Sequence, residues 1–477
     1  MTVLEDLVSA LSADSAERAK IADALAYLVQ RQDLSGIRGH QLTLEIDSAV
    51  AGILETLGVQ LDAILHHPEI LALEAAWLEL SFVVARIDYD SNTTTEILSC
   101  TREEFDEDLN QSPEVTSSGL YSTIYRNAIG MYGGSPYGIL TTYFRFGPHI
   151  EDLTTLKLIA SIAAMAHAPL LADADPAFFD LVSYSHLPQM TDLSNSFLGE
   201  RFAAWRAFRE SEDARYVGLC LPRFVLRQPH DVHNDTTTPI RYRENLPRGS
   251  RDLLWGHAAS LVTVIAAGSF ARYRWCVFLT GSNAGAVTRL HRWEYASLVG
   301  IWSRCSLECV VTNRAERALA EQGFISLVFE RSRGQATMLS SPSLRSTTRP
   351  SQSRAPTEDD IGQHLGSQLT YVFLVCRLAH YIKLIQQEQI GAELDRGALE
   401  SVLTKWISRY ISDMDNPAPD VLAARPLRSA SVEVQLVEGQ TGWYRCSLRI
   451  RPHLTHNNAT FTLALVGKLD HRQGGHA

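Results

Sequence analysis

Apolar residues recur at helical spacing in the segment that begins at Pro68. They are three or four residues apart, and they are Ile70, Leu73, Trp77, Leu80 and Val84. Proline suits the first position of a helix, and Glu69 places a negative charge at the positive end of the helix dipole. The spacing therefore predicts a helix that is buried along one stripe, followed by a short strand from Val83.

Helical and strand-like patterns alternate through the middle of the chain. Helices are predicted at 151–171, 197–213 and 253–273. The segment at 132–146 is predicted to be a glycine turn that leads into a strand, and strand-like apolar runs lie at 216–226 and 274–281. Pro222 breaks the run at 216–226 or places it at a sheet edge, because proline has no N–H for the strand ladder. The alternation predicts an α/β or α+β fold, with helices around mixed sheets.

The chain is long enough for more than one domain. It has 477 residues, and a single hydrophobic core usually stops growing near about 250–300 residues. We expect an N-terminal arm or linker, an α/β core, an exposed Ser/Pro-rich loop, and a C-terminal region of helices and strands. In chain order, the bounds of these segments are 1–45, 46–333, 334–362 and 363–477.

Three C-terminal runs alternate apolar and polar residues, as half-buried strands do. The apolar faces carry Val432, Val434 and Leu436, then Tyr444, Cys446, Leu448 and Ile450, then Phe461, Leu463 and Leu465. Matching the first two faces pairs Leu436 with Tyr444 and Val434 with Cys446, and leaves a loop at 438–442. A slip of one residue would turn every apolar side chain to the wrong face. The third predicted strand covers 460–466.

The opposite face of the middle strand is basic. It carries Arg445, Arg449 and Arg451. A solvated face with cross-strand partners such as Gln435 accounts for this arginine stripe. A docking surface for an acidic partner accounts for it as well, and the sequence leaves both interpretations open.

Charge and cysteine content narrow the functional classes. The net charge of −11 argues against generic binding to nucleic acid or to anionic membranes. Seven cysteines without a CxxC pair indicate buried free thiols in a reducing compartment. The acidic N-terminus lacks the basic region of a signal peptide, and the longest apolar run is short for a membrane span. We expect a cytoplasmic protein.

No common signature of catalysis or cofactor binding occurs in the sequence. GxSxG, HExxH, GxxxxGK[ST] and a GxGxxG after a strand are all missing. His230, Asp231 and His233 share a polar loop, which suits a metal site or a hydrolase but also an ordinary solvated loop. We therefore predict no enzyme, cofactor or metal, and keep a hydrolase that uses this loop as the alternative from another class.

Charged residues of both signs are concentrated before the run at 216–226. The charge cluster consists of Arg206, Arg209, Glu210, Asp213 and Arg215. Arg209 and Asp213 are four residues apart, as are Arg206 and Glu210, so each pair can meet on a helix surface. Exposed pairs of this kind contribute about 0–1 kcal/mol each. Without a nucleophile nearby, we interpret the cluster as structural, organising the fold or an interface.

Several long segments resemble one known family. LHHPEILALEAAWLELSFVV and FRESEDARYVGLCLPRFVLRQP are similar to the most recognisable segments of the large subunit of the type VI secretion contractile sheath, a bacterial relative of phage tail sheaths. Five further segments also match, and all of the segments stand in the family's order along the chain. They are PYGILTTYFRF, AAMAHAPLLADADPAFF, LLWGHAASLV, VTNRAERALAEQGFI and RPLRSASVEV. The resemblance extends over about residues 65–469.

The resemblance implies a tail-sheath-like fold and a structural role. Family members pair with a small sheath subunit, and the heterodimers stack as rings into a helical tube around an inner tube of haemolysin-coregulated protein. The sheath stands on a baseplate, its contraction propels the tube and effectors, and a Clp-type AAA+ ATPase dismantles it, mainly through the small subunit. The C-terminal strands are expected to interlace with those of neighbouring protomers, and the arginine stripe to touch the inner tube or a partner.

Some segments depart from the family pattern. The N-terminal arm is short, and the stretches at 281–295 and 336–354 differ from what usually stands there. These differences concern surface contacts and leave open a divergent subfamily, a paralogue, or a sheath of a related contractile injection system. A monomeric binding module with a capped C-terminal sheet edge is a further alternative.

Overall fold

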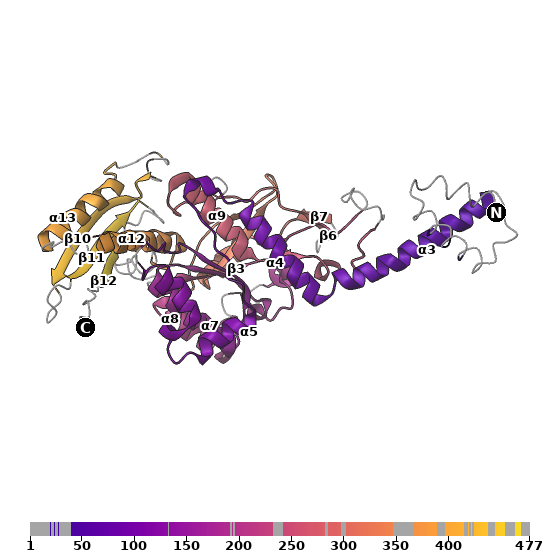
Figure 1. Ribbon diagram of the computed structural model, residues 1–477, viewed down its shortest axis with the longest axis horizontal. Coiled ribbons are helices and arrows are strands. Elements are labelled where there is room, and N and C mark those ends of the chain that lie inside the picture. Colours follow the sequence, from indigo (N-terminus) through magenta and orange to yellow (C-terminus); the bar gives the residue numbers. More distant parts are fainter. Residues whose placement is uncertain are drawn as a thin grey trace. The chain divides into compact units, whose positions relative to one another are not determined.

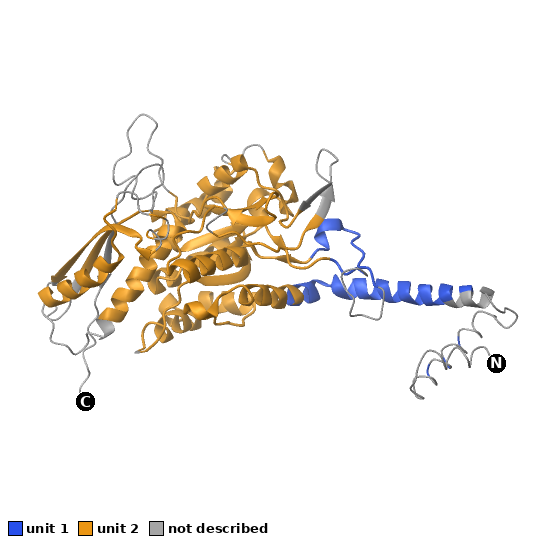
Figure 2. Cartoon of the chain, turned by 90° about the horizontal axis from the view of Figure 1, so that it is seen from above, with its two compact units in different colours: residues 1–73, 229–253 blue, residues 74–228, 254–477 orange. Residues whose placement is uncertain are grey.

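The chain forms two compact units. The computed structural model describes residues 40–131, 133–190, 196–231, 242–281, 285–296, 302–346, 366–388, 396–414, 424–436, 444–453 and 463–468, and single residues at 20, 23, 27, 193, 418 and 421. The first unit comprises residues 1–73 and 229–253, and the second comprises residues 74–228 and 254–477 (Figures 1 and 2).

The first unit is built on helix α3 (His40–Leu65). The segment at 242–253 packs against the end of this helix: the Tyr242 hydroxyl donates to Asp62 Oδ1 at 2.5 Å, and the backbone N–H of Asn245 donates to the same oxygen at 3.1 Å. Helix α4 (Pro68–Val84) then begins at Pro68, as predicted, and continues into the second unit.

A five-stranded sheet forms the centre of the second unit. Its order is β1-β2-β3-β8-β9, with the first four strands parallel and β9 antiparallel to β8. The strands are β1 (Leu140–Phe146), β2 (Leu170–Ala174), β3 (Val217–Leu221), β8 (Phe324–Glu330) and β9 (Gln335–Met338). All residues of β2 and β3 are buried, as the continuous apolar runs of parallel strands require. The predicted α/β fold class is confirmed.

Helices cover both faces of this sheet (Figure 1). Helix α7 (Ile150–Ala166) connects β1 to β2 and packs on one face. Helix α9 (Ala258–Tyr273) lies on the opposite face, where Thr263 Oγ1 is 2.7 Å from Thr141 Oγ1. Helix α12 (Leu369–Glu388) approaches β3 so closely that a Cβ at Gly218 would lie 2.6 Å from Leu369 Cδ1. A glycine at this point of β3 therefore makes room for the helix.

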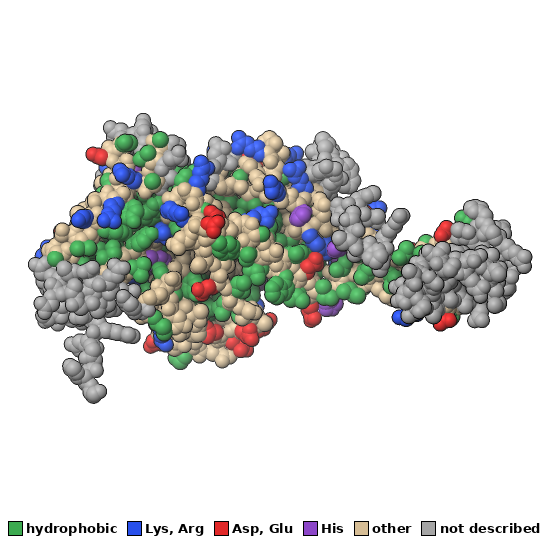
Figure 3. Space-filling model, turned by 45° about the horizontal axis from the view of Figure 1, so that its top comes forward, with side chains coloured by type: hydrophobic (Ala, Val, Ile, Leu, Met, Phe, Trp, Pro, Cys, Tyr) green, Lys and Arg blue, Asp and Glu red, His purple; other side chains and the backbone are tan. Residues whose placement is uncertain are grey.

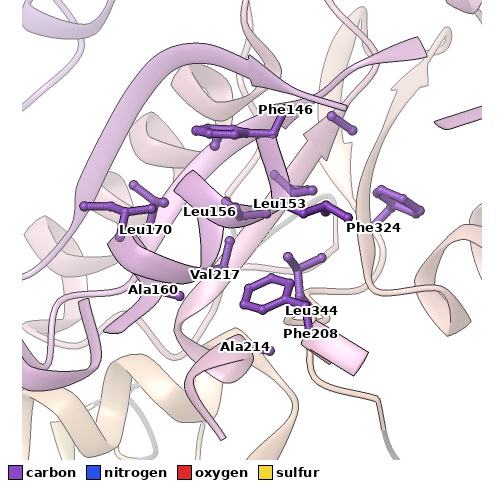
Figure 4. Packing of buried hydrophobic residues seen from close by; sticks show 14 of the residues in the cluster. Phe146, Leu153, Leu156, Ala160, Leu170, Phe208, Ala214, Val217, Phe324 and Leu344 are labelled. Atoms are coloured by element: carbon purple, nitrogen blue, oxygen red, sulfur yellow. The ribbon is translucent and has the colours of Figure 1, made fainter. Parts of the chain in front are cut away.

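Aromatic rings fill the core on the α7 side of the sheet. Phe324, at the start of β8, lies 5.3–5.7 Å from the centroids of the rings of Phe178, Phe179, Phe197 and Trp205. Figure 4 shows Leu156, Val217, Phe208 and Phe324 in this core. Burying one large apolar side chain stabilises a fold by about 1.5–3 kcal/mol, so this cluster dominates the stability of the unit.

The remaining elements of the central region are short. The helices are α5 (Arg102–Gln111), α6 (Gly119–Tyr121), α8 (Ala203–Glu210) and α10 (Asn313–Glu321), with a π-helical turn at Ser122–Asn127. Two antiparallel strand pairs are β4 (Phe224–Val225) with β5 (Trp255–Gly256), and β6 (Trp293–Ala296) with β7 (Trp302–Cys305). Turns of 3₁₀ helix lie at Tyr89–Ser91, Val115–Ser117, Pro176–Phe179, Tyr184–Gln189, Glu200–Phe202, Asp213–Tyr216, Gly249–Arg251 and Ser408–Tyr410.

A second core lies toward the C-terminus. It joins helices α12 (Leu369–Glu388) and α13 (Arg396–Ile407) to strands β10 (Leu427–Leu436), β11 (Tyr444–Pro452) and β12 (Leu463–Lys468). These elements lie in the region predicted to consist of helices and strands.

The cysteines are free thiols, as predicted. Cys220, Cys305, Cys309, Cys376 and Cys446 are buried, whereas Cys100 and Cys276 are partly buried. Burial raises the pKa of the Cys305 thiol to about 11, which keeps it protonated and unreactive at neutral pH.

Three predicted elements differ from the structure. The helix expected at 197–213 is reduced to α8, because single 3₁₀ turns precede and follow it. In the apolar run at 274–281, Trp275, Val277 and Leu279 are buried but no strand forms; Thr280 makes an isolated bridge to Met338. The described residues between Val83 and β1 contain no strand. A short apolar run indicates that a segment is buried, but its pattern alone does not distinguish a strand from a buried irregular segment.

Two further predictions, for Pro222 and for the Ser/Pro-rich loop at 334–362, also differ from the structure. Pro222 ends β3 in the middle of the sheet, so the strand breaks there, and the interpretation as a sheet edge was wrong. The exposed loop expected at 334–362 was wrong at its beginning, where β9 and residues 341–344 are buried. Backbone bonds such as Ser343 N to Ser367 O, at 2.7 Å, satisfy this segment internally. Residues 347–365 lie outside the described part of the chain.

Candidate assembly surfaces

The C-terminal sheet has the register that its alternating pattern predicts. Strands β10, β11 and β12 are antiparallel neighbours in that order. Leu436 pairs with Tyr444 and Val434 with Cys446, which confirms the prediction. The loop predicted at 438–442 lies outside the described residues.

The apolar face of this sheet packs against the chain's own helices. Val434, Cys446, Leu448 and Ile450 are buried in one cluster with side chains of α12 and α13, and Val432 packs against it. In register, Leu448 pairs with Leu465 and Ile450 with Leu463, so the third strand continues the same face. This strand begins at Leu463 rather than Thr460, and Phe461 lies outside the described residues. Any sheet shared with a neighbour must therefore extend through strand edges.

Both outer edges of the sheet are largely open. Within the part of the chain that the structure describes, β10 and β12 each have a strand partner on one side only. The beginning of β10 is the exception, because the Ser412 N–H donates to Leu427 O at 2.9 Å and Ile411 bridges Leu427. Unpaired N–H and C=O groups along a strand are a template for pairing with another chain.

The arginine stripe lies on the other face of the sheet. Arg445 is in register with Gln435, as expected, and with Lys468 on the other side. Arg449 is exposed and lies opposite Ser431 and Ala464. The face is polar and accessible at Arg449, and both interpretations of the stripe stay open.

Helix α3 carries an uncovered apolar face (Figure 3, green). Its exposed residues Val50, Ile53, Leu57 and Ile64 are three, four and seven positions apart, the spacing of a coiled-coil seam. The part of α3 from Asp47 to Leu65 is long enough for a candidate membrane span, and its mean hydropathy is 1.4. This part is not buried in the structure. A seam of this kind on a helix is typical of an interface with another helix.

The stripe predicted to be buried on α4 is exposed instead. Leu73 is 61% exposed and Trp77 is 67% exposed, whereas the buried residues of this helix are Glu79 and Val83. The prediction was wrong because periodicity identifies an apolar face and does not say what covers it. Large exposed apolar patches mark interaction sites.

The charge cluster at 206–215 is structural, but its predicted ion pairs were wrong. Helix α8 ends at Glu210, so Asp213 does not lie one helical turn beyond Arg209. The Arg209 side chain is buried and donates to Leu344 O at 2.9 Å, to Glu321 O at 3.0 Å and to Gln322 Oε1 at 3.1 Å. Burial lowers the pKa of Arg209 to about 10.

The other members of the cluster also bond to different partners. Arg206 Nη1 donates to Phe197 O and Gly199 O, each at 2.8 Å, rather than to Glu210. Arg215 forms an ion pair with Glu212, which also pairs with Arg345 at 2.5 Å. The arginines thus tie α8 and the following turn to neighbouring loops.

A buried acid–base group that the sequence did not indicate lies between α4, β2 and α9. His257 Nδ1 is 2.8 Å from Glu79 Oε2, and the Ser260 hydroxyl donates to Glu79 Oε1. Asp173 accepts the backbone N–H groups of Ala258 and Ala259 at 2.9 and 2.8 Å, at the start of α9. The residues come from distant segments, so no local motif could have revealed them.

Burial and neighbouring charges shift the pKa values of Asp173 and His257. It raises the pKa of Asp173 to about 6, against the influence of His257 and the two backbone donors. Burial alone would lower the pKa of His257, but the Glu79 carboxylate outweighs it and the pKa is raised. Glu79, Asp173 and Ser260 are almost completely buried, so a substrate has no route to the serine. The arrangement positions the beginning of α9.

The histidine loop is only partly described. The His230 N–H donates to Glu244 Oε2 at 2.9 Å, and Glu244 Oε1 lies 3.0 Å from His66 Nε2. His233 lies outside the described residues. Among the residues that are described, no group of three His, Cys, Asp or Glu side chains is arranged to hold a metal ion.

Open sheet edges and uncovered apolar helix faces are typical of a subunit that assembles with other subunits. Comparison with known proteins identifies the family of this subunit. The family model described as EvpB/VC_A0108, tail sheath N-terminal domain, matches residues 47–345, and the gpW/gp25-like tail sheath domain of the same family matches residues 358–469. The chain belongs to this family, that of the large subunit of the type VI secretion sheath, and it is a contractile sheath subunit.

A relative of known function agrees with this assignment. The type VI secretion system sheath protein TssC1 of Pseudomonas aeruginosa is 30% identical over 430 residues, which cover 89% of this chain and 86% of that protein. Two solved structures are more distant. The baseplate of the anti-feeding prophage has 12% identity and a TM-score of 0.36, over 77% of this chain and 81% of that chain. The sheath tail protein Lin1278 of Listeria innocua has 10% identity and a TM-score of 0.35, over 74% and 60%.

Proposed function

We propose that this chain pairs with the small sheath subunit and that the heterodimers polymerise into a helical tube around an inner tube. Contraction of the sheath then propels the inner tube and its effectors. The observation that carries the proposal is the coexistence of an uncovered helical seam on α3 with a sheet that is open at both edges. The seam suits a tight partner helix, and the edges suit repeated pairing between copies.

The seam on α3 is the proposed contact with the small subunit. Apolar residues at heptad spacing insert between those of a partner helix, and the hydrophobic effect contributes about 25 cal/mol for each Å² of apolar surface buried. Four such residues, Val50, Ile53, Leu57 and Ile64, face outward on one side of α3.

The sheet edges are the proposed contacts between heterodimers. A strand of a neighbour added to β10 or β12 gains main-chain hydrogen bonds for affinity, and alternating side chains set its register. Such a connection can hold neighbours together while their cores rotate, as a transition between two packings requires. The residues at 1–45 are proposed as a second linker.

The other partners follow from membership in the family. We propose a cytoplasmic sheath that stands on a baseplate, touches a haemolysin-coregulated inner tube, and is dismantled by a Clp-type AAA+ ATPase mainly through the small subunit. The arginine stripe is the proposed electrostatic contact with the inner tube or a partner. No cofactor or metal takes part. No observation favours the hydrolase that would use the histidine loop.

Co-expression with the small sheath subunit, followed by electron microscopy of the purified material, tests the proposal. We expect long tubes. A chain carrying Ile53→Asp should lose the small subunit, whereas Ala51→Asp, also exposed on α3 but outside the seam, should retain it. A soluble monomer that ignores the small subunit would refute the proposal.

A further inference from the structure

A pocket of about 200 Å³ lies beside the C-terminal part of α4. Helix α4, strand β4 and the segment at 289–291 contribute its walls. The lining residues are Leu78, Ser81, Phe82, Ala85, Arg86, Val225, Leu226, Arg289, Leu290 and His291. Most of them are apolar, and the others place three nitrogen-bearing side chains at one pocket. We call Arg86, Arg289 and His291 the cationic rim, whose charge comes from the two arginines.

The rim is held in place by its surroundings. Arg86 Cζ lies 3.8 Å from the centroid of the Phe82 ring, and that ring lies 5.0 Å from the ring of Phe224. Arg289 adopts a left-handed backbone conformation, with φ of 56°, which costs a non-glycine residue free energy. Two backbone hydrogen bonds between Val287 and Ala336, at 2.9 and 3.0 Å, anchor the segment that carries it.

The positive charge of the rim has no acidic partner at the pocket. No Asp or Glu lines it, and Arg86 Nη1 donates to a backbone oxygen, that of Phe82, at 3.4 Å rather than to a carboxylate. The rim groups act on one another instead: burial and then Arg289 lower the pKa of Arg86, and burial and then Arg86 lower the pKa of His291. An anion at the pocket would relieve this repulsion.

We propose that this pocket docks an acidic peptide segment of a second copy of this chain in the sheath. An apolar side chain of the segment enters between α4 and β4, and a neighbouring Asp or Glu carboxylate pairs with the cationic rim. The inference rests on the proposed function in one respect, that the partner is a subunit of the same sheath.

The lining favours a peptide over a free anion. A small inorganic ion would engage the rim but leave the apolar floor in water. The apolar surface also continues beyond the pocket along α4, where Trp77 and Val84 are exposed. An extended or helical segment covers both regions at once, and the abundance of acidic residues in this chain, with its net charge of −11, makes a second copy a chemically suitable source.

Photo-crosslinking in assembled sheaths tests the inference. A p-benzoylphenylalanine replaces the exposed Thr288, next to the rim, in the full chain co-expressed with the small subunit. After irradiation, mass spectrometry should identify a peptide of a second copy of this chain that contains Asp or Glu close to the cross-link. A cross-link to the small subunit alone would overturn the inference. A cross-linked peptide without an acidic residue, or no intermolecular cross-link, would overturn the inference.

Charge variants sharpen the test. Arg86→Gln with Arg289→Gln should lower the cross-link yield about ten-fold, because charge-assisted contacts are lost, whereas Arg86→Lys with Arg289→Lys should retain most of it. The matched control is Arg314→Gln with Arg317→Gln on α10, which are exposed and distant in sequence from the pocket. An equal loss in the pocket and control variants would overturn the inference.

Two results keep this inference separate from the proposed function. If the wild-type chain forms no sheath with the small subunit, the proposed function fails. If wild-type sheaths form and the cross-link does not depend on the rim, only the pocket inference fails. Should the double Gln variant not fold, Arg289→Gln alone serves, because the Arg289 side chain is exposed.

Discussion

The five-stranded central sheet and the three-stranded C-terminal sheet of the second unit differ in how completely the chain covers them. The central sheet has helices on both faces, and its strands β2 and β3 are buried throughout. The C-terminal sheet has one face on α12 and α13, an exposed Arg449 on the other face, and two open edges. The chain's own helices cover both faces of the first sheet, whereas the second sheet has one face uncovered by helices, and we propose that its edges pair with other chains.

This difference indicates that the folding stability of the subunit and its contacts with neighbours depend on different sheets. A rigid core that moves as a body needs tight internal packing, whereas a connection between moving bodies needs backbone hydrogen bonds that survive a change of angle. The comparison predicts that substitutions in the central sheet unfold the chain and that changes at the C-terminal edges leave it folded but unassembled.

The largest effect is expected in the aromatic core. Phe324→Ala removes a fully buried ring that contacts four others, and should lower the free energy of unfolding by about 3–5 kcal/mol. Urea unfolding of the purified heterodimer measures this change. Trp77→Ala, which removes a ring that is 67% exposed, is the control and should change stability by about 0.5 kcal/mol or less. Similar losses in both variants would contradict the comparison.

Removing the last strand should abolish assembly and spare the heterodimer. Deletion of β12, Leu463–Lys468, removes one open edge and its pairing with β11. We expect a soluble heterodimer by size-exclusion chromatography and no tubes by electron microscopy. Deletion of residues 471–476 removes the same length of chain but none of the residues of β10, β11 or β12, and should leave tubes intact. Full-length tubes after loss of β12 would refute a role for this edge.

An intermediate effect is expected at Arg209. Arg209→Ala leaves three acceptors, Leu344 O, Glu321 O and Gln322 Oε1, without this donor, and should cost about 1–3 kcal/mol of stability. Thermal unfolding of the heterodimer measures the loss. Arg314→Ala on the surface of α10 should have little effect. If the two variants behave alike, Arg209 does not tie α8 to its neighbouring loops.

A smaller, pH-dependent effect is expected at His257. The pKa of His257 is raised in the folded chain, so the contribution of its contact with Glu79 is fully present below about pH 6.5. It is lost as the pH rises through the higher folded value. The melting temperature should therefore fall more between pH 6 and pH 8.5 in the wild-type chain than in His257→Gln. An identical pH dependence of the two chains would exclude a charged His257.

The smallest effect on stability is expected at the arginine stripe. Arg449→Ala removes an exposed side chain and should change the free energy of unfolding by about 0.5 kcal/mol or less. If the stripe contacts a partner, tubes of this variant should come apart at a lower salt concentration than wild-type tubes. Unchanged salt resistance would show that the face is only solvated.

Local chemistry predicted much of the secondary structure. Pro68 begins α4 as expected, and the register of β10 on β11 follows from alternation because one face must be buried. The prediction of a strand at 274–281 was wrong, because a short apolar run is equally compatible with a buried irregular segment. The cationic rim was also missed, since α4 and the segment at 289–291 are some 200 residues apart in the chain.

By itself, the sequence determined which residues form the main helices and strands, which faces are apolar, and which family the chain resembles. These properties depend on spacing and on residue type, and both can be read along one chain. Only the tertiary structure decided that the stripe on α4 is exposed, that Arg209 bonds to backbone carbonyls, and that the C-terminal sheet keeps its edges open. Coverage of a face depends on what packs against it, and that is set by contacts between segments far apart in the sequence.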